Sequence, residues 1–262
     1  MHLETITRLP EGKTGHTPLL FVHAAWHGAW CWDEHFLPYF ADHGYPSHAF
    51  DLRGHGKSDN PRSLRTTRID HYVEDLASVI ETLDTLPVLV GHSMGGLIVQ
   101  RYLEGRNLPA AVLLATDPVG GVLGTTLRMV KRHPLPFAMA NLKMRLWPIV
   151  ETPKLARDAF FPDDMSEADS DRYWSRLQDE SYLAYLDMLA FRKPRPDRVT
   201  TPVMILGGEA DRIFSKAEMA KTARAYGVPP VMIPGAAHDL MLDTRWQQVA
   251  DAMLAWLTER GL

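Results

Sequence analysis

The 262-residue sequence has little of several features that define other classes of protein. It contains one cysteine, Cys31, so no internal disulfide can form, which is typical of proteins from a reducing compartment. No run approaches the roughly 18 consecutive apolar residues of a membrane-spanning helix. The first ten residues also lack a charged stretch followed by an apolar core, which a secretory signal requires. We therefore expect a soluble, cytoplasmic protein without stable membrane insertion.

The charge balance shows no basic excess that could attract nucleic acid. The chain has 28 basic and 32 acidic side chains, which gives a formal net charge of −4. Hydrophobic residues make up 45% of the sequence and charged residues 23%, which is ordinary for a globular protein and excludes disordered and fibrous classes. We therefore expect no nucleic-acid partner, and the sequence leaves the oligomeric state open.

Short apolar runs bounded by proline or glycine recur along the chain. Because both faces of each run are apolar, they predict buried parallel strands. Helical spacing of apolar residues lies between them, for example at Ile69, Val73 and Leu76. This alternation predicts an α/β fold with a doubly wound, mostly parallel sheet, whose ligands bind beyond the carboxyl ends of the strands. The six runs are residues 18–23, 47–51, 87–91, 110–116, 202–207 and 230–234.

One long segment, residues 120–193, breaks this alternation. It holds no convincing strand, is rich in leucine, methionine and aromatic residues, and is interrupted by prolines. A structureless stretch of this length is improbable inside a compact domain, so the segment predicts several short helices. We expect a core domain formed by residues 1–119 and 194–262, with residues 120–193 inserted as a helical cap.

The segment 91–95 places a serine between two glycines where a strand meets a helix. Ser93 lies two residues after the end of the predicted strand at 87–91 and precedes a run compatible with a helix. A nucleophile elbow needs this context, because a tight turn strains the serine backbone and presents its hydroxyl beyond the sheet. Glycines at both ends let the strand and the helix approach each other without collision. Ser93 is therefore the predicted nucleophile.

A serine hydroxyl is a weak nucleophile, so this chemistry needs a histidine as base and a carboxylate that orients it. His238 lies in a loop after the last predicted strand, and Asp211 lies in a loop after the strand before it. The chain order Ser93, Asp211, His238 is the one expected for this arrangement. Asp117, which follows an earlier strand, is the alternative acid. Other histidines are expected to support the structure: His23, His55 and His92.

Acyl transfer also needs backbone N–H groups at the point where the negative charge of the tetrahedral intermediate develops. Met94, directly after the serine, is expected to supply one of these groups. Ala25, in the loop after the strand at 18–23, is expected to supply the other. Neighbouring residues are expected to pack against this loop and hold it in place: His27, Gly28, Trp30 and Trp32.

These residues together resemble the α/β-hydrolase superfamily over almost the whole chain. The resemblance implies a serine esterase or lipase that works through an acyl-enzyme and needs no metal or organic cofactor. Segment 23–32 is in addition similar to the oxyanion loop of the plant methylesterase and hydroxynitrile lyase group. The motifs that carry the resemblance are His23-Ala24-Ala25, segment 51–58, segment 91–96, Asp211 and His238.

Two positions depart from these relatives. The superfamily usually has glycine at the position of Ala24, and the change implies a shifted loop backbone or a narrower pocket. Hydroxynitrile lyases of the group typically have threonine there and lysine directly after the catalytic histidine, where this chain has Asp239. Because a negative charge opposes a bound anion such as cyanide, the resemblance implies that lyase activity is disfavoured.

We therefore expect a serine hydrolase that cleaves a carboxylic ester of a small molecule. The alternatives are a lysophospholipase or interfacial lipase, or a carbon–carbon bond, thioester or lactone hydrolase with the same triad. A hydroxynitrile lyase and a non-catalytic binding protein are less favoured. Apolar residues of the cap predict a pocket for a small to medium apolar acyl or alcohol group: Leu127, Met129, Leu135, Phe137, Met139, Leu142, Met144, Leu146 and Trp147.

Overall fold

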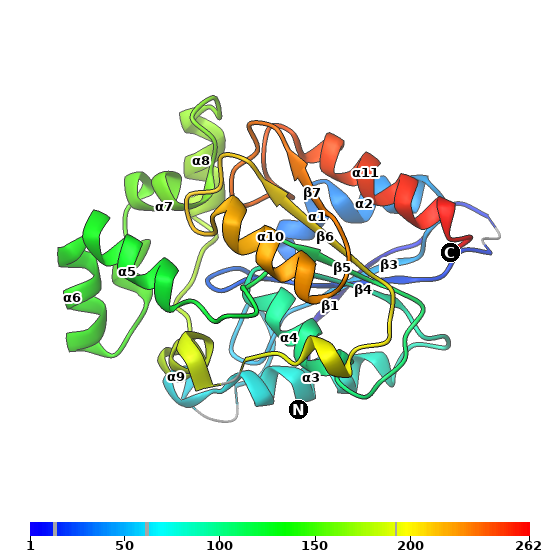
Figure 1. The fold of residues 1–262 in the computed structure, drawn as a ribbon, viewed down its shortest axis with the longest axis horizontal. Helices are drawn as coiled ribbons and strands as arrows, with labels where there is room; N and C mark the ends of the chain where they lie inside the picture. The colour runs from blue at the N-terminus through cyan, green and yellow to red at the C-terminus, as the bar shows by residue number, and fades with distance from the viewer. Residues whose placement is uncertain (13–14, 61–62, 192) are drawn as a thin grey trace.

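A seven-stranded sheet runs through the centre of the molecule in the order β1-β3-β2-β4-β5-β6-β7 (Figure 1). The structure is a computed structural model, and it describes residues 1–12, 15–60, 63–191 and 193–262. β1 pairs with β3 in antiparallel fashion, and all other neighbouring strands are parallel. The strands are β1 Thr5–Arg8, β2 Leu19–Val22, β3 Ser47–Phe50, β4 Val88–His92, β5 Ala111–Leu114, β6 Val203–Gly208 and β7 Pro230–Ile233.

All six apolar runs of the sequence form strands, β2 to β7, and the predicted α/β fold is confirmed. β1 was not predicted from the sequence, and it has three exposed residues and one half-buried residue. β1 lies at the edge of the sheet, where it needs no continuous apolar run because only one neighbour pairs with it. An edge strand of four residues therefore leaves too weak a pattern to be recognised.

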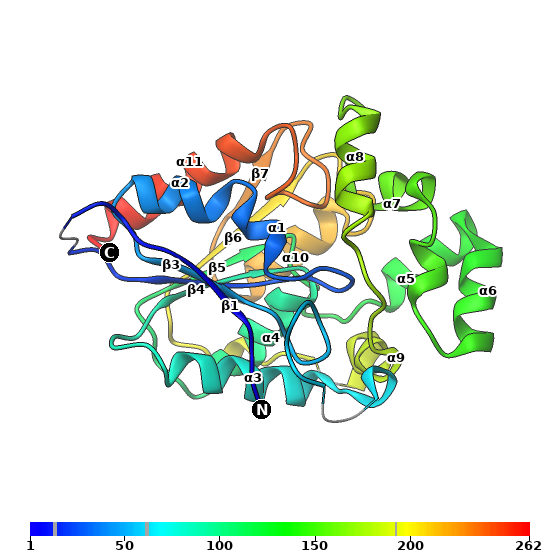
Figure 2. The same ribbon diagram turned by 180° about the vertical axis from the view of Figure 1, so that it is seen from behind.

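Helices cover both faces of the sheet, as Figures 1 and 2 show. Apolar side chains of α1, α2 and α11 pack on one face, and those of α3, α4 and α10 pack on the other. No helix in the described part of the chain is long and apolar enough to cross a bilayer. These helices are α1 Trp30–Asp33, α2 Phe36–Asp42, α3 Ile69–Ile80, α4 Met94–Leu103, α10 Lys216–Ala225 and α11 Trp246–Glu259.

The chain between β5 and β6 is helical and contains no strand among its described residues. Its helices α5 to α8 gather at one end of the molecule, beyond the sheet (Figures 1 and 2). The division into a core domain and a cap at 120–193 stays a prediction. Residues 13–14 and 61–62 of the predicted core and residue 192 of the predicted cap lie outside the described residues. The helices are α5 Leu123–Arg132, α6 Pro134–Lys143, α7 Pro153–Phe160, α8 Glu167–Trp174 and α9 Tyr182–Leu186, followed by a π-helical turn at Asp187–Phe191.

A buried carboxylate fastens this helical insert to the rest of the fold. Glu180 lies 3.0 Å from Nε2 of His55 and accepts a hydrogen bond of 2.7 Å from the hydroxyl of Tyr72. All three residues are buried. Breaking such a pair inside a protein leaves an unpaired charge, so the contact strongly favours the docked position of the insert. His55 thus has the supporting role expected from the sequence.

Candidate active site

The turn between β4 and α4 holds Ser93 in a strained conformation. Its φ of 50° and ψ of −117° lie where residues with a side chain are rarely found. A Cβ atom on Gly91 would lie 2.5 Å from the carbonyl oxygen of Gly95, and one on Gly95 would lie 2.3 Å from that of Val22. Both positions therefore require glycine, because larger residues would push the strand and the helix apart. The turn has the geometry that the sequence pattern predicts.

His238 and Asp211 meet at the same edge of the sheet. Nδ1 of His238 lies 2.9 Å from Oδ2 of Asp211, and both side chains are almost fully buried. The other oxygen, Oδ1 of Asp211, accepts hydrogen bonds from the backbone N–H groups of Ile213 and Phe214, at 2.7 and 3.0 Å. These donors hold the carboxylate in place. A proton on Nδ1 leaves Nε2 of the neutral imidazole free to act as a base.

The surroundings of His238 also set its protonation. Burial disfavours the charged imidazolium and lowers the pKa of His238. The charge and the hydrogen bond of Asp211, together with the charges of Asp239 and Asp117, raise this pKa by more than burial lowers it. The pKa of His238 is therefore raised above its ordinary value. A raised pKa makes the histidine a stronger base and stabilises the imidazolium that forms when it takes a proton.

The loop of His238 packs against the serine turn. His92, the residue before Ser93, donates a hydrogen bond of 2.9 Å from Nε2 to the carbonyl oxygen of His238, and the two rings lie 4.9 Å apart. Phe214 and Phe160 contact the other sides of the His238 ring, at 5.3 and 6.2 Å between centroids. The hydroxyl of Ser93 makes no hydrogen bond to His238 in the described part of the chain. Such bonds often tighten only when substrate binds.

Asp117, the alternative acid, lies in the same region but does not bond to the imidazole. Its carboxyl group is buried, and neither oxygen has a hydrogen-bond partner among the described residues. Burial raises the pKa of Asp117 to about 7, and His238 opposes this shift. A carboxyl group that is half neutral near pH 7 orients an imidazole less well than a carboxylate does. The geometry therefore pairs His238 with Asp211.

The two backbone N–H groups expected to hold an oxyanion lie on adjacent loops. Val22 at the end of β2 pairs with Gly91 of β4, so the loops that follow these strands run side by side. Ala25 lines the same pocket as Ser93, and Met94 begins helix α4. Neither the N–H of Ala25 nor that of Met94 donates a hydrogen bond within the described residues. Both remain available for a ligand.

A buried pair that sequence reasoning missed, His27 and Asp239, joins the loop of Ala25 to the loop of His238. Nδ1 of His27 donates a hydrogen bond of 2.8 Å to the carbonyl oxygen of Ala25, and Nε2 lies 2.9 Å from Oδ2 of Asp239. Burial opposes ionisation of Asp239, but His27 and its neighbours outweigh it and lower the pKa of Asp239. Both ring nitrogens of His27 thus lie at hydrogen-bond distance from oxygen atoms, and the ring links the loop of Ala25 to the loop of His238.

The two positions that depart from the relatives do not line the pocket beside Ser93. The expectation that the negative charge of Asp239 disfavours a bound anion stays a prediction, and this charge also raises the pKa of His238. In the structure Asp239 is fully buried against His27 and does not line the pocket, and Ala24 does not line it either. Both departures from the relatives therefore lie behind the pocket wall. His27 supports the loop as expected, but its partner is 212 positions away in the sequence, and no local pattern signals it.

We expect Asp239→Ala to lower the free energy of unfolding by roughly 3 to 5 kcal/mol, because it breaks a fully buried contact between Asp239 and Nε2 of His27. Urea denaturation followed by circular dichroism measures the change. Asp84→Ala is the matched control, since Asp84 is exposed and surface substitutions usually change stability by less than about 0.5 kcal/mol. Equal stability of the two variants would show that the pair contributes nothing to the fold.

Three buried groups near the serine place possible metal-ligand atoms within 4.8 Å of one another: His92, His238 and Asp239. Each already has a polar partner. His92 bonds to the carbonyl oxygen of His238, His238 bonds to Asp211, and Asp239 bonds to His27. We therefore interpret the cluster as a hydrogen-bonded network that holds the loops together, and we assign no metal to it.

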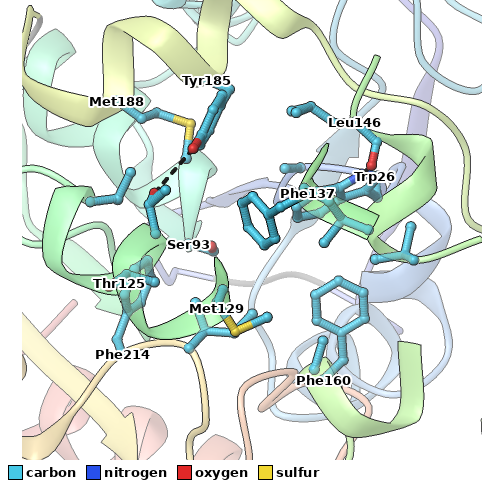
Figure 3. A pocket seen from close by; sticks show the side chains of 17 residues that line it. Trp26, Ser93, Thr125, Met129, Phe137, Leu146, Phe160, Tyr185, Met188 and Phe214 are labelled. Carbon is cyan, nitrogen blue, oxygen red and sulfur yellow. Dashed lines mark hydrogen bonds between the residues drawn. The ribbon is translucent and has the colours of Figure 1, made fainter. Parts of the chain in front are cut away.

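The pocket beside Ser93 is small and apolar (Figure 3). Its volume is about 80 Å³, well below the roughly 300 to 1,000 Å³ of typical small-molecule pockets. Polar contacts at its wall include the indole N–H of Trp26, which donates to the carbonyl oxygen of Leu146 at 3.4 Å, and the hydroxyl of Tyr185, which donates to Thr126 at 3.2 Å. The pocket therefore suits a short apolar group.

The cap residues predicted to form this pocket divide into two sets. Met129, Phe137 and Leu146 line the pocket, together with aromatic residues such as Phe160 and Tyr185 that the prediction missed. Trp147 is half-buried outside the lining. The prediction is wrong for Trp147 and for five residues that are exposed to solvent: Leu127, Leu135, Met139, Leu142 and Met144. Composition alone does not show which side of a helix faces the pocket.

Comparison with known proteins identifies the family. A mostly parallel sheet with a serine turn after β4 is the arrangement of a hydrolase-type α/β protein. The model of the alpha/beta hydrolase family matches residues 19–252, and the chain belongs to this family. The resemblance inferred from the sequence motifs is therefore confirmed.

Individual relatives share only part of their sequence with this chain. A non-heme chloroperoxidase of Streptomyces lividans is 39% identical over 107 residues, which span 39% of this chain and 38% of that protein. A 2-(acetamidomethylene)succinate hydrolase of Mesorhizobium japonicum is 28% identical over 207 residues, or 72% of this chain and 70% of that protein. The monoacylglycerol lipase structure from Paleococcus ferrophilus matches with a TM-score of 0.73 at 23% identity, covering 99% of this chain and 100% of that one, which is a likeness of fold alone.

Proposed function

We propose that the protein is a serine hydrolase that cleaves a carboxylic ester of a small molecule. Ser93 is the nucleophile, His238 the general base and Asp211 the residue that orients it. The observation that carries the proposal is the 2.9 Å contact between Nδ1 of His238 and Asp211, on a loop packed against the strained serine turn. Membership of the alpha/beta hydrolase family supports the reaction class.

The reaction begins when Nε2 of His238 takes the proton of the Ser93 hydroxyl and the serine oxygen attacks the ester carbonyl. The N–H groups of Ala25 and Met94 hold the oxyanion of the tetrahedral intermediate. The intermediate collapses, the bond to the alcohol oxygen breaks, and His238 returns the proton to the departing alcohol. A water molecule then repeats the attack on the acyl-enzyme, again with His238 as base, and releases the acid.

The pocket favours a short apolar acyl or alcohol group. Its volume of about 80 Å³ holds only a few carbon atoms, and its walls are aliphatic and aromatic side chains such as Met129, Phe137 and Phe160. A panel of acyl donors tests this preference. We expect higher kcat/KM for short esters than for long-chain esters, and product analysis on the same panel distinguishes esters from thioesters, lactones and carbon–carbon substrates.

Covalent labelling tests the assignment of the nucleophile directly. A fluorophosphonate forms a stable adduct with an activated serine, and mass mapping of the labelled peptide locates the modified residue. We expect one adduct, on Ser93, and none in Ser93→Ala. Ser175→Ala is the matched control, because Ser175 is an exposed serine on the surface of the helical insert. Labelling at another residue, or labelling that persists in Ser93→Ala, would reject the proposal.

A further inference from the structure

Exposed apolar side chains are concentrated on one part of the molecule. Of the ten large apolar residues that are exposed in the described part of the chain, seven lie between positions 123 and 144. Leu135 and Leu142 are 76% and 79% exposed. We call these seven residues the cap patch: Leu123, Leu127, Val130, Leu135, Met139, Leu142 and Met144.

The cap patch follows the geometry of helices α5 and α6. On α5 its residues are Leu123, Leu127 and Val130, and on α6 the same spacing of four and then three residues recurs at 135, 139 and 142. This spacing puts the three side chains on one face of each helix. The opposite faces contribute Met129 and Phe137 to the pocket. Each helix is thus apolar on two sides, and the outer side carries the exposed side chains.

The two helices lie at one end of the molecule. Figures 1 and 2 place α5 and α6 side by side at the end of the molecule farthest from the C-terminus. Large exposed apolar patches are rare on monomeric proteins and usually mark a surface that binds a partner or a membrane. The seven side chains of the cap patch are exposed in the described fold and can therefore contact a partner or a membrane.

The charge around the cap patch is strongly one-sided. Residues 118–150 contain no aspartate or glutamate, although the whole chain carries a net charge of −4. Lys131 and Lys143 are exposed and make no ion pair within the described residues. The other basic residues of the segment pair with carboxylates elsewhere: Arg128 with Glu218, Arg132 with Asp158 and Arg145 with Asp179.

A basic groove lies next to the cap patch. It has a volume of about 650 Å³ and includes Leu135 of the patch. Four cationic side chains and two carboxylates, Asp158 and Asp163, line the groove, so the net charge of its lining is positive. The four are Arg132, Lys154, Arg157 and Arg212. A groove of this charge is suited to the anionic headgroup of a lipid.

We propose that the cap patch docks the protein on an anionic lipid surface. The apolar side chains enter the boundary between headgroups and acyl chains, while Lys131 and Lys143 approach the anionic headgroups. A second copy of the chain fits less well, because a two-fold contact pairs the same surface of both copies and residues 118–150 hold no carboxylate that could pair with the lysines of the other copy. Docking is a property of the outer face of α5 and α6 and does not depend on the nature of the substrate.

Vesicle sedimentation tests the proposal. We expect the full chain to bind vesicles of phosphatidylglycerol and phosphatidylcholine in equal amounts, and to bind pure phosphatidylcholine weakly. The triple variant Leu127→Ser, Leu135→Ser, Leu142→Ser should bind about tenfold less or weaker. Lys131→Glu with Lys143→Glu should lower binding by a similar factor, as should added salt. Turnover of a short ester should stay unchanged in all variants, which shows that they fold.

The matched control is Leu9→Ser with Leu86→Ser, which removes two exposed leucines outside the cap patch. This variant should bind vesicles as the parent chain does. Failure of the parent chain to bind anionic vesicles, or equal binding by the triple variant, would overturn the proposal. Analytical ultracentrifugation tests whether a second copy of the chain binds the cap patch instead. If the parent chain is a dimer and the triple variant is a monomer, the cap patch is a contact between two copies and the lipid-docking proposal is overturned.

Discussion

Ser93→Ala should lower kcat by about four to six orders of magnitude and leave the protein folded. The hydroxyl forms the covalent bond of the acyl-enzyme, so its removal takes away the whole chemical route and not one stabilising contact. The methyl group of alanine fits where the serine side chain stands, and only the strained backbone remains. Hydrolysis of a chromogenic short-chain ester, followed with the parent chain and the variant at equal concentration, measures the loss.

The residual rate of this variant is informative. Oxyanion donors and substrate binding alone can retain roughly a thousandfold acceleration over water, so activity above that level would point to another nucleophile. Thermal unfolding provides the control for folding. Ser93 has a positive φ, and alanine at this position keeps the same backbone strain because it also has a Cβ atom. The melting temperatures of the parent chain and of Ser93→Ala should therefore lie close together.

Asp211→Asn should lower kcat by about four orders of magnitude, because an amide neither orients the His238 imidazole in the same tautomer nor stabilises its charged form. The dependence of kcat/KM on pH distinguishes an effect of Asp211 on the His238 imidazole from a general structural role of Asp211. The base must be neutral, and the pKa of His238 is raised, so the parent chain should lose kcat/KM on the acid side at a pH above the ordinary histidine value of about 6.5.

In Asp211→Asn the largest contribution that raises this pKa is gone, and burial then dominates. We therefore expect the acid limb of the profile to move to lower pH in the variant. Asp117→Asn is the matched control, because its carboxyl group is equally buried and near His238 but bonds to no described residue. It should change kcat only a few-fold. If Asp117→Asn is the crippling substitution and Asp211→Asn is tolerated, the orienting acid is Asp117.

Much of the frame of this protein could be read from local patterns. Strands β2 to β7 are recognisable because each is buried on both faces and must therefore be apolar throughout. The serine turn is recognisable because Gly91 and Gly95 occupy positions where a Cβ atom would collide with backbone oxygens. In both cases a steric or solvation requirement acts on a few consecutive residues, so the sequence itself records it.

The choice between two acids could not be made in this way. Asp117 and Asp211 both follow parallel strands and both precede loops at the same sheet edge. What distinguishes them is the direction of the side chains, which brings Asp211 and not Asp117 to Nδ1 of His238. Sequence position specifies the strand end, but a hydrogen bond depends on orientation within a fraction of an ångström.

The amino-acid sequence by itself determined the α/β sheet, the serine turn and the family, because strand burial and glycine contacts are encoded within short segments. Only the tertiary structure decided that His27 pairs with Asp239. It also decided which side of α5 and of α6 lines the pocket and which side is exposed to solvent. His27 and Asp239 are distant in the chain and meet only once β2 and β7 have taken their places in one sheet. Likewise an apolar helix can bury either side, and packing against the pocket, not composition, leaves the cap patch in solvent.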